Sequence, residues 1–236
     1  MARKLGVAPD DVVAAAARIA DTDGLDAVTL ASVAAALGVR PPSLYAHVDG
    51  LDGLRRRLAL HAAAAMAEQL EGAAAGRTGL DALQAIAHAY RDFAHAHPGW
   101  YAAAQRAVRP GEDDELYQAL ATAAMPAIRA MADTGLDGDD AIHLTRAFRA
   151  ALHGFVSLER VGGFGMPASI DESFRRFVDL LLAGVRGWVR GAALAGGARP
   201  AENEAVATRA PPEARSCSSD TTASRSPPAA LRPARR

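Results

Sequence analysis

The sequence predicts an all-α fold. Its 236 residues are rich in alanine, contain few runs of β-branched residues and are 50% hydrophobic, a composition that favours helix along most of the chain. Apolar residues recur at helical spacing in one segment after another, and glycine or proline separates the segments. The formal net charge of −1 argues against a broad, non-specific nucleic-acid binder, but not against a small domain that makes a few local contacts.

The first expected helix begins at Asp10 and Asp11, whose carboxylates complement the dipole at a helix N-terminus, and it ends near Gly24. A short second helix follows Thr29, whose hydroxyl can accept a hydrogen bond from a free N–H group of the first turn. The apolar stripe of this second helix consists of Leu30, Val33, Ala34 and Leu37.

A tight corner separates this helix from the next one. Gly38 follows the last apolar position, where a positive φ is often required, and Pro41 suits the first turn of a new helix. Leu44 and Val48 anchor the new helix, so the side chains between them point outward and fit the width of a DNA major groove. An ordinary helical hairpin is the alternative that the pattern leaves open. The side chains from which we expect DNA contacts are Thr29, Arg40, Pro41, Ser43, Tyr45 and His47.

This stretch resembles the helix-turn-helix of the TetR family of bacterial transcriptional regulators. The family combines a threonine and hydrophobic positions with a Gly-Val corner, followed by a hydrophobic-Tyr-x-His-Phe/Val sequence. The residues that match one by one are Thr29, Leu30, Val33, Ala34, Leu37, Gly38, Val39, Leu44, Tyr45, His47 and Val48. The resemblance implies a regulator that binds a near-palindromic, double-stranded DNA operator as a homodimer and responds to a small-molecule effector.

The sequence departs from the family at two positions that usually contribute contacts to the DNA backbone. Leu51 stands where the family carries a lysine that docks on phosphate, and Ala46 replaces a frequent second aromatic residue. Both changes lower the expected DNA affinity more than they affect the fold. Arg55, Arg56 and Arg57 follow one turn later, and they either restore part of the missing charge or form a solvated helix face.

Beyond the corner the periodicity predicts a series of longer helices. Pro126 lies inside one of them and is expected to kink it. The expected helices cover about residues 51–71, 80–97, 98–106, 112–131, 139–161 and 169–194.

The last helix is apolar on more than one face, so it must bury two sides, one of them on something other than its own domain. A dimer interface needs such a surplus, and the TetR resemblance implies a bundle formed by the last two helices of each protomer. The segment Leu152–Glu159 also resembles a TetR-like subgroup with a His-Gly step in the penultimate helix. The candidate interface residues are Phe174, Phe177, Val178, Leu181, Leu182, Val185 and Trp188.

Large apolar side chains on the body helices indicate a pocket for a small molecule. For any single one of them, plain core packing is the alternative. His88 and His153 are the polar residues that we expect to orient a ligand there. The candidate pocket residues are His88, Tyr90, Phe93, Trp100, Tyr101, Met125, Met131, Phe148, His153 and Phe155.

Catalytic, metal-binding and membrane-spanning signatures do not stand out. The 7 histidines lack carboxylates at ligand spacing, the single cysteine permits neither an intramolecular disulfide nor a cysteine metal site, and no nucleotide fingerprint occurs in a suitable context. No apolar run reaches the length of a membrane span, and the first residues lack a signal-peptide core. We therefore expect no enzymatic activity, no cofactor, no metal, no membrane association and a cytoplasmic location.

Together these features predict a helix-turn-helix DNA-binding domain at residues 1–54, a helical ligand-binding and dimerisation domain at 55–194 and a disordered tail at 195–236. The expected function is that of a ligand-responsive transcriptional regulator, with repression as the family default. A helical, dimeric interaction protein without DNA binding or catalysis is the main alternative. A helical enzyme that depends on His88 or His153 is a further one.

Overall fold

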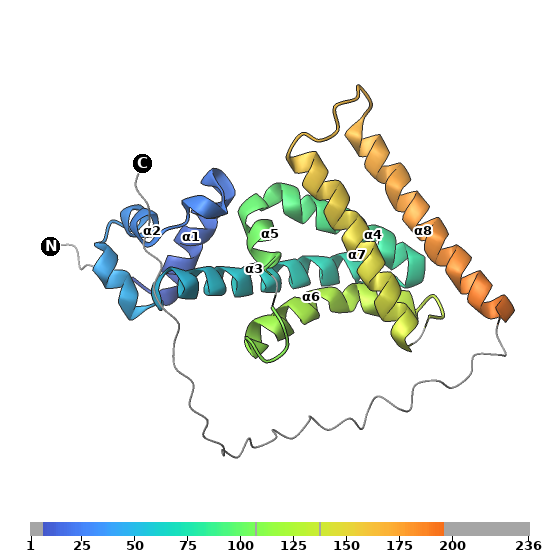
Figure 1. Ribbon diagram of the computed structural model, residues 1–236, viewed down its shortest axis with the longest axis horizontal. Coiled ribbons are helices and arrows are strands. Elements are labelled where there is room, and N and C mark those ends of the chain that lie inside the picture. Colours follow the sequence, from blue (N-terminus) through green and yellow to red (C-terminus); the bar gives the residue numbers. More distant parts are fainter. Residues whose placement is uncertain (1–6, 107, 137, 196–236) are drawn as a thin grey trace, which may run out of the picture. The chain divides into compact units, whose positions relative to one another are not determined.

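The computed structural model describes residues 7–106, 108–136 and 138–195, and within these ranges the chain forms helices joined by short loops, without β-strands (Figure 1). The elements in chain order are α1 (Pro9–Asp23), η1 (Leu25–Ala27), α2 (Leu30–Ala36), η2 (Pro41–Ala46), α3 (Gly50–Ala74), α4 (Gly79–Ala96), α5 (Pro98–Ala104), α6 (Asp114–Ala132), α7 (Gly138–Arg160) and α8 (Ile170–Ala195).

The all-α prediction is confirmed, and the helix positions follow the apolar periodicity closely. The expected tail at residues 195–236 lies outside the described residues, except for Ala195. α6 continues through Pro126 as a single helix. Among the described residues, no helix combines the length and the apolar character that crossing a membrane requires.

α3 connects the N-terminal helices to the rest of the protein. It packs against α1 at one end and against α4, α5 and α6 further along, and Figure 1 shows it running from the α1–α2 region into the body. Leu54 and Leu58 are fully buried near its beginning, and Met66 and Leu70 are buried near its end. The domain boundary expected at residue 54 therefore falls inside one continuous helix, so the two predicted domains share α3.

A second connection joins α1 to α5. The Asp21 carboxylate accepts hydrogen bonds from the backbone N–H groups of Gly99 (2.8 Å) and Trp100 (3.2 Å), and its other oxygen lies 3.2 Å from Nδ1 of His97. Asp21 thus satisfies free donors in the first turn of α5 and complements the dipole of that helix. Gly99 packs so closely on α1 that a Cβ at this position would lie 2.1 Å from the carbonyl carbon of Ala20.

A partly buried cluster of ion pairs connects α7 and α8 to α4. Arg91 of α4 binds both carboxylate oxygens of Glu159 in α7, and its Nη2 also donates to Asp171 at the start of α8 (2.7 Å). The side chains of Arg91 and Glu159 are only 15% and 8% exposed. Nε2 of His95 lies 3.0 Å from the same Glu159 carboxylate. Because the Arg91–Glu159 pair is shielded from water, we expect it to contribute more to the stability of the fold than an exposed surface ion pair does.

This ion pair makes a pH-dependent contribution to stability. Arg91 holds the pKa of the Glu159 carboxyl below its ordinary value. The contribution is therefore fully present above the unfolded-state pKa of about 4.3, and it is lost as the pH falls through the lower pKa of the folded state. We expect Glu159→Gln to lower the free energy of unfolding at pH 7 by about 2 kcal/mol.

Urea unfolding of the wild type and Glu159→Gln at pH 7 and pH 3.5, at one protein concentration, measures both effects. The variant should lose less stability than the wild type on acidification, because it lacks the titrating group. The matched control is Glu68→Gln on the exposed side of α3, which we expect to change stability at pH 7 by less than about 0.5 kcal/mol. Equal losses on acidification in the wild type and Glu159→Gln would contradict the assignment.

Candidate DNA-binding surface and ligand pocket

The corner between α2 and η2 has the geometry that the sequence predicts. The Thr29 hydroxyl accepts from the backbone N–H of Ser32 (3.0 Å), and the Ser32 hydroxyl accepts from the backbone N–H of Thr29 (3.0 Å), which is a reciprocal cap. Gly38 has a φ of +66°, a conformation that costs a glycine little. The backbone N–H of Val39 then donates to the Ala34 carbonyl (3.0 Å), which closes the corner.

The second element of the motif is a 3₁₀ helix of six residues that begins with two prolines, at positions where a missing N–H costs nothing. Leu44 is fully buried and Val48 nearly so, which fixes this segment to the underlying helices. Arg40, Pro41, Ser43 and Tyr45 are exposed, with Tyr45 at 62%, Thr29 is exposed at the N-terminus of α2, and His47 is half-buried. The predicted DNA contacts therefore gather on one short, mostly exposed segment, apart from Thr29 at the N-terminus of α2.

The arginines at the start of α3 are not equivalent. Arg56 forms hydrogen bonds with Asp113 (2.5 and 2.7 Å) and with Glu115 (2.7 Å), so it connects α3 to the beginning of α6. The guanidinium lowers the pKa of the Asp113 carboxyl, as expected for a close ion pair. Arg56 is thus engaged within the protein, whereas Arg57 is exposed and remains available for a phosphate.

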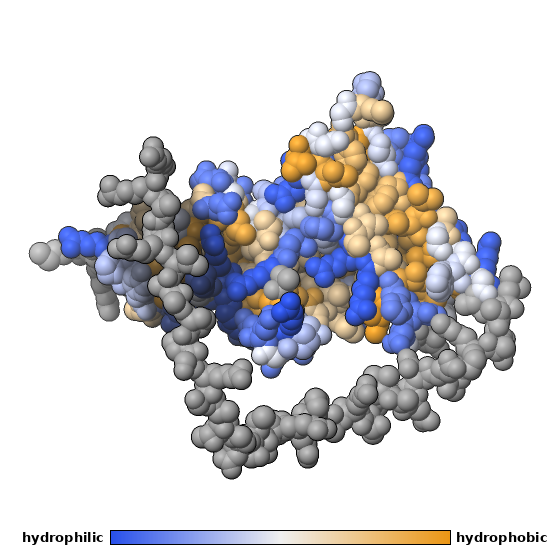
Figure 2. Space-filling view, viewed as in Figure 1, coloured by the Kyte–Doolittle hydropathy of each residue, from blue (hydrophilic) through white to orange (hydrophobic). Residues whose placement is uncertain are grey.

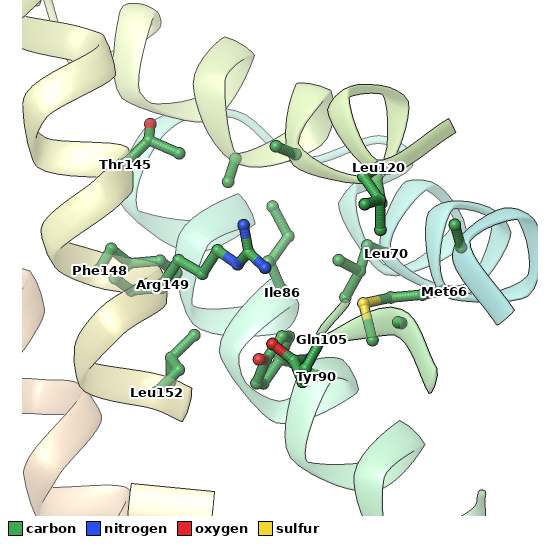
Figure 3. A pocket seen from close by; sticks show the side chains of 15 residues that line it. Met66, Leu70, Ile86, Tyr90, Gln105, Leu120, Thr145, Phe148, Arg149 and Leu152 are labelled. Carbon is green, nitrogen blue, oxygen red and sulfur yellow. The ribbon is translucent and has the colours of Figure 1, made fainter. Parts of the chain in front are cut away.

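A cavity of about 60 Å³ lies between α3, α4, α6 and α7 (Figure 3). Figure 3 shows Arg149 extending from α7 toward the middle of this cavity. A groove of about 500 Å³ adjoins it on the side of α6 and α7, and Gln105, Leu120, Thr145 and Arg149 line both spaces. Much of the apolar lining of the cavity comes from Met66, Leu70, Ile86, Leu120, Phe148 and Leu152.

A hydrogen-bonded chain lies beside the cavity. The hydroxyl of Tyr90 donates to that of Tyr101 (3.2 Å), and the Tyr101 hydroxyl lies 2.6 Å from Nδ1 of His153. Burial raises the pKa of both tyrosines and lowers that of His153, so all three groups are neutral at pH 7. Because Tyr90 lines the cavity and Tyr101 belongs to α5, this chain connects the cavity to the helix that Asp21 of α1 caps.

The structure brings some predicted pocket residues to the cavity and places others elsewhere. Tyr90 and Phe148 line it, Tyr101 and His153 lie behind Tyr90, and Met125 lines the adjoining groove. The remaining ones do not line either space. Phe93 and Met131 are buried in the core, and Trp100 packs between His61 and His97. His88 contacts Phe174, and Phe155 packs among Phe164, Phe174 and Phe177.

Several lining residues were not expected from the sequence. Met66, Leu70 and Ile86 belong to regular apolar stripes, and nothing in their spacing separates a cavity from a filled core. Gln105 follows α5 and Arg149 belongs to α7, so no local pattern indicates that these two polar residues line the same cavity. Among the described residues, no group of three or more His, Cys, Asp or Glu side chains forms a metal site.

The residues predicted for a dimer interface divide into two groups. Phe174, Val178, Leu182 and Val185 are buried within the protomer, where α8 packs on α4 and α7. Phe177 and Leu181 are half-buried, and Trp188 is 52% exposed. The space-filling view shows apolar atoms gathered over α7 and α8 (Figure 2). The large hydrophobic residues exposed on α7, α8 and the loop between them are Ile142, Leu158, Val161, Met166, Leu180 and Trp188.

Comparison with known proteins gives consistent matches to one kind of regulator. Residues 83–181 match the family model described as the tetracyclin repressor-like, C-terminal domain. The chain is 39% identical over 162 residues to an HTH-type transcriptional regulator of Mycobacterium tuberculosis, a match that covers 69% of this chain and 74% of the relative. It is 33% identical over 186 residues to an HTH-type transcriptional regulator of Bacillus subtilis, covering 78% of this chain and 96% of the relative.

The fold is also similar to solved structures. One is a TetR variant from Acinetobacter baumannii AYE in complex with minocycline, with a TM-score of 0.59 and 24% identity, covering 77% of this chain and 98% of that chain. At this identity the likeness concerns the fold. The subgroup with a His-Gly step, expected from residues 152–159, stays a prediction.

Proposed function

Because the chain belongs to the TetR family of helix-turn-helix transcriptional regulators, we propose that it is a repressor that binds a near-palindromic operator as a homodimer and leaves it when a small molecule enters the body. The observation that carries the proposal is the exposed segment from Arg40 to Tyr45, held in place by the buried Leu44 and by the closed corner at Gly38. Such a segment fits a major groove, where side chains reach base edges and phosphates.

The exposed apolar surface on α7 and α8 supports the homodimer. Leu180 is 70% exposed and Trp188 is 52% exposed on the same helix, although large side chains of this kind are usually buried. A two-fold dimer would cover this surface in both protomers at once. It would also present two copies of η2 to half-sites about 34–36 Å apart, or a multiple of that distance.

The cavity supports the response to a ligand. It lies against α3, which extends to the DNA-binding end, and beside Tyr101 of α5, which contacts α1. A ligand that fits better after a shift of these helices favours a different spacing of the two DNA-binding segments. To change operator occupancy strongly, the ligand must prefer the released state by several kcal/mol. A protein with a similar fold has been solved in complex with minocycline, so this fold is compatible with binding a small molecule.

The proposed function implies that the protein acts in the cytoplasm, and it argues against an enzymatic activity. A regulator of this family acts on the bacterial chromosome, which supports a cytoplasmic location. The names of the relatives indicate a transcriptional regulator and not an enzyme. A dimer that selects no DNA sequence would match the alternative of a helical interaction protein.

We predict that Tyr45→Ala and Arg40→Ala each lower operator affinity about tenfold, because a good contact to a base is worth about 1–3 kcal/mol. An operator is first selected from random duplexes with the purified protein, and dissociation constants are then measured at one salt concentration. Both side chains are exposed, so circular dichroism should show unchanged helix content.

The matched controls replace residues of the same type outside the DNA-binding segment. Tyr117→Ala on α6 and Arg18→Ala on α1 should leave operator affinity within about twofold of the wild type. If the variants at Tyr45 and Arg40 bind the selected operator as tightly as these controls, the assignment of the DNA-binding segment is wrong. If selection yields no preferred sequence at all, the proposed function itself fails.

A further inference from the structure

We propose that the effector is an amphiphilic organic oxyanion, whose charged group binds Arg149 where the cavity meets the outer groove and whose apolar part fills the cavity. The inference rests on the proposed function as a ligand-responsive regulator and names the chemical class of its ligand. Three features support it: the charge of the groove, a buried hydroxyl without a partner, and the apolar lining of the cavity.

The groove is lined by three arginines and by no carboxylate of the described residues. Arg106, Arg146 and Arg149 line it, and no Asp or Glu side chain lines either the groove or the cavity. Arg106 lies close enough to Asp113 to lower the pKa of that carboxyl. Within the described part of the chain, no ion pair engages Arg146 or Arg149, whereas Arg56 and the half-buried Arg91 both bind carboxylates.

Uncompensated guanidinium groups next to an apolar cavity attract an anion, because the low-dielectric wall strengthens the interaction and the planar group can bind two oxygens at once. Figure 3 shows Arg149 reaching from α7 toward the cavity rather than away from it. Its position at the junction allows it to hold a charged group that remains partly solvated in the groove. A fully buried charge would lose that hydration.

Neutral polar groups at the junction complete the recognition of an oxyanion. Thr145 is 7% exposed, and its hydroxyl is buried without a hydrogen-bond partner in the structure. Leaving such a hydroxyl unsatisfied is unfavourable, so a ligand oxygen that accepts a hydrogen bond from it gains affinity. Gln105 lines both spaces and supplies amide donors. The donors near the junction therefore outnumber the acceptors, which favours an anion over a cation.

The interior of the cavity determines which chemical group the uncharged end of the ligand can carry. Leu70, Ile86, Phe148 and Leu152 line it, and Tyr90 has its hydroxyl engaged with Tyr101. A space of about 60 Å³ accommodates several carbon atoms but offers no counter-charge for a second ionic group. A polyhydroxylated or doubly charged molecule would leave polar groups unpaired there, whereas an alkyl or aryl group would not.

Isothermal titration calorimetry of the full chain with simple probes tests this inference. Octanoate and octyl phosphate carry the two common oxyanions, 1-octanol is neutral and octylamine is cationic. We expect at least one of the two anions to bind at least tenfold more tightly than 1-octanol and to outcompete octylamine, and the tighter of the two identifies the head group. Affinity should rise about threefold to fourfold for each methylene from butanoate to octanoate, until the cavity is filled.

Two variants separate the roles of charge and cavity. Arg149→Met keeps an unbranched apolar side chain but removes the charge, and it should weaken binding of the preferred anion about tenfold or more, while 1-octanol binding changes less than twofold. The matched control Arg18→Met should leave both unchanged. Ala127→Leu, whose added atoms enter the cavity, should remove the dependence on chain length. Since Ala127→Leu has the greater risk of misfolding, the chain-length series on the wild type provides the same information without a substitution.

The outcomes distinguish this inference from the proposed function. If neither anion binds better than the alcohol, or if Arg149→Met leaves the preference intact, the inference is overturned. The proposed function still stands in that case when the protein selects an operator. Conversely, if the anions bind as expected but no operator is selected, the ligand class is supported and the proposed function fails.

Discussion

Replacing Gly99 by alanine should lower the free energy of unfolding by about 3 kcal/mol or more. This is one of the two largest effects that we expect from any substitution in this protein. A Cβ at this position would lie 2.1 Å from the carbonyl carbon and 2.2 Å from the carbonyl oxygen of Ala20. Both are backbone atoms of α1, so no side-chain rotation can relieve the overlap. The helices must separate, which also lengthens the hydrogen bonds from Gly99 and Trp100 to Asp21.

Urea unfolding at a fixed protein concentration measures this effect. The matched control is Gly72→Ala in α3, where a Cβ would meet no atom within 4 Å. Alanine favours helix more than glycine does, so the control should be neutral or more stable by up to about 1 kcal/mol. A Gly99→Ala variant as stable as this control would show that α1 and α5 are not in the contact described here.

The second large effect concerns the apolar surface of α8. We expect the double substitution Leu180→Glu and Trp188→Glu to convert the dimer into a monomer and to lower operator affinity about a hundredfold or more. Both side chains are exposed in the protomer, so the charges cost little there. In a dimer the charges would be buried without partners. A monomer also loses the gain that comes from two linked DNA contacts, which typically amounts to a factor of about 10²–10⁴.

Light scattering coupled to size-exclusion chromatography gives the molecular mass, and a titration with the selected operator gives the affinity. Ala64→Glu, which adds one glutamate to an exposed position of α3, is the control and should remain dimeric with wild-type affinity. A double variant that stays dimeric would place the interface elsewhere. A monomeric variant with undiminished operator affinity would show that pairing is not needed for DNA binding.

Local features of the fold could be predicted from the sequence because they depend on neighbouring residues. The cap at Thr29 and the positive φ of Gly38 follow from the chemistry of single side chains, and both are confirmed. Helix positions follow from apolar periodicity in the same way. The second element of the corner is a 3₁₀ helix, a detail that the spacing of Leu44 and Val48 does not indicate.

Contacts between distant residues could not be predicted in this way. The hydrogen bonds from the first turn of α5 to Asp21 join residues 78 positions apart or more, and no local pattern indicates them. Apolar periodicity in α8 indicated which positions are hydrophobic, but it did not distinguish Val178, buried within the protomer, from Trp188, exposed on its surface. The same limit applies to the cavity, since a stripe that lines an empty space looks like one that packs a core.

Because α3 is one uninterrupted helix, a small tilt at one of its ends produces a larger displacement at the other. With 25 residues it is about 37 Å long, at 1.5 Å per residue, so a tilt of about 5° at its far end displaces its beginning by about 3 Å. A displacement of that size equals the full length of a hydrogen bond to a base edge. Small rearrangements deep in the body are thus amplified mechanically, and no hinge has to bend within the helix.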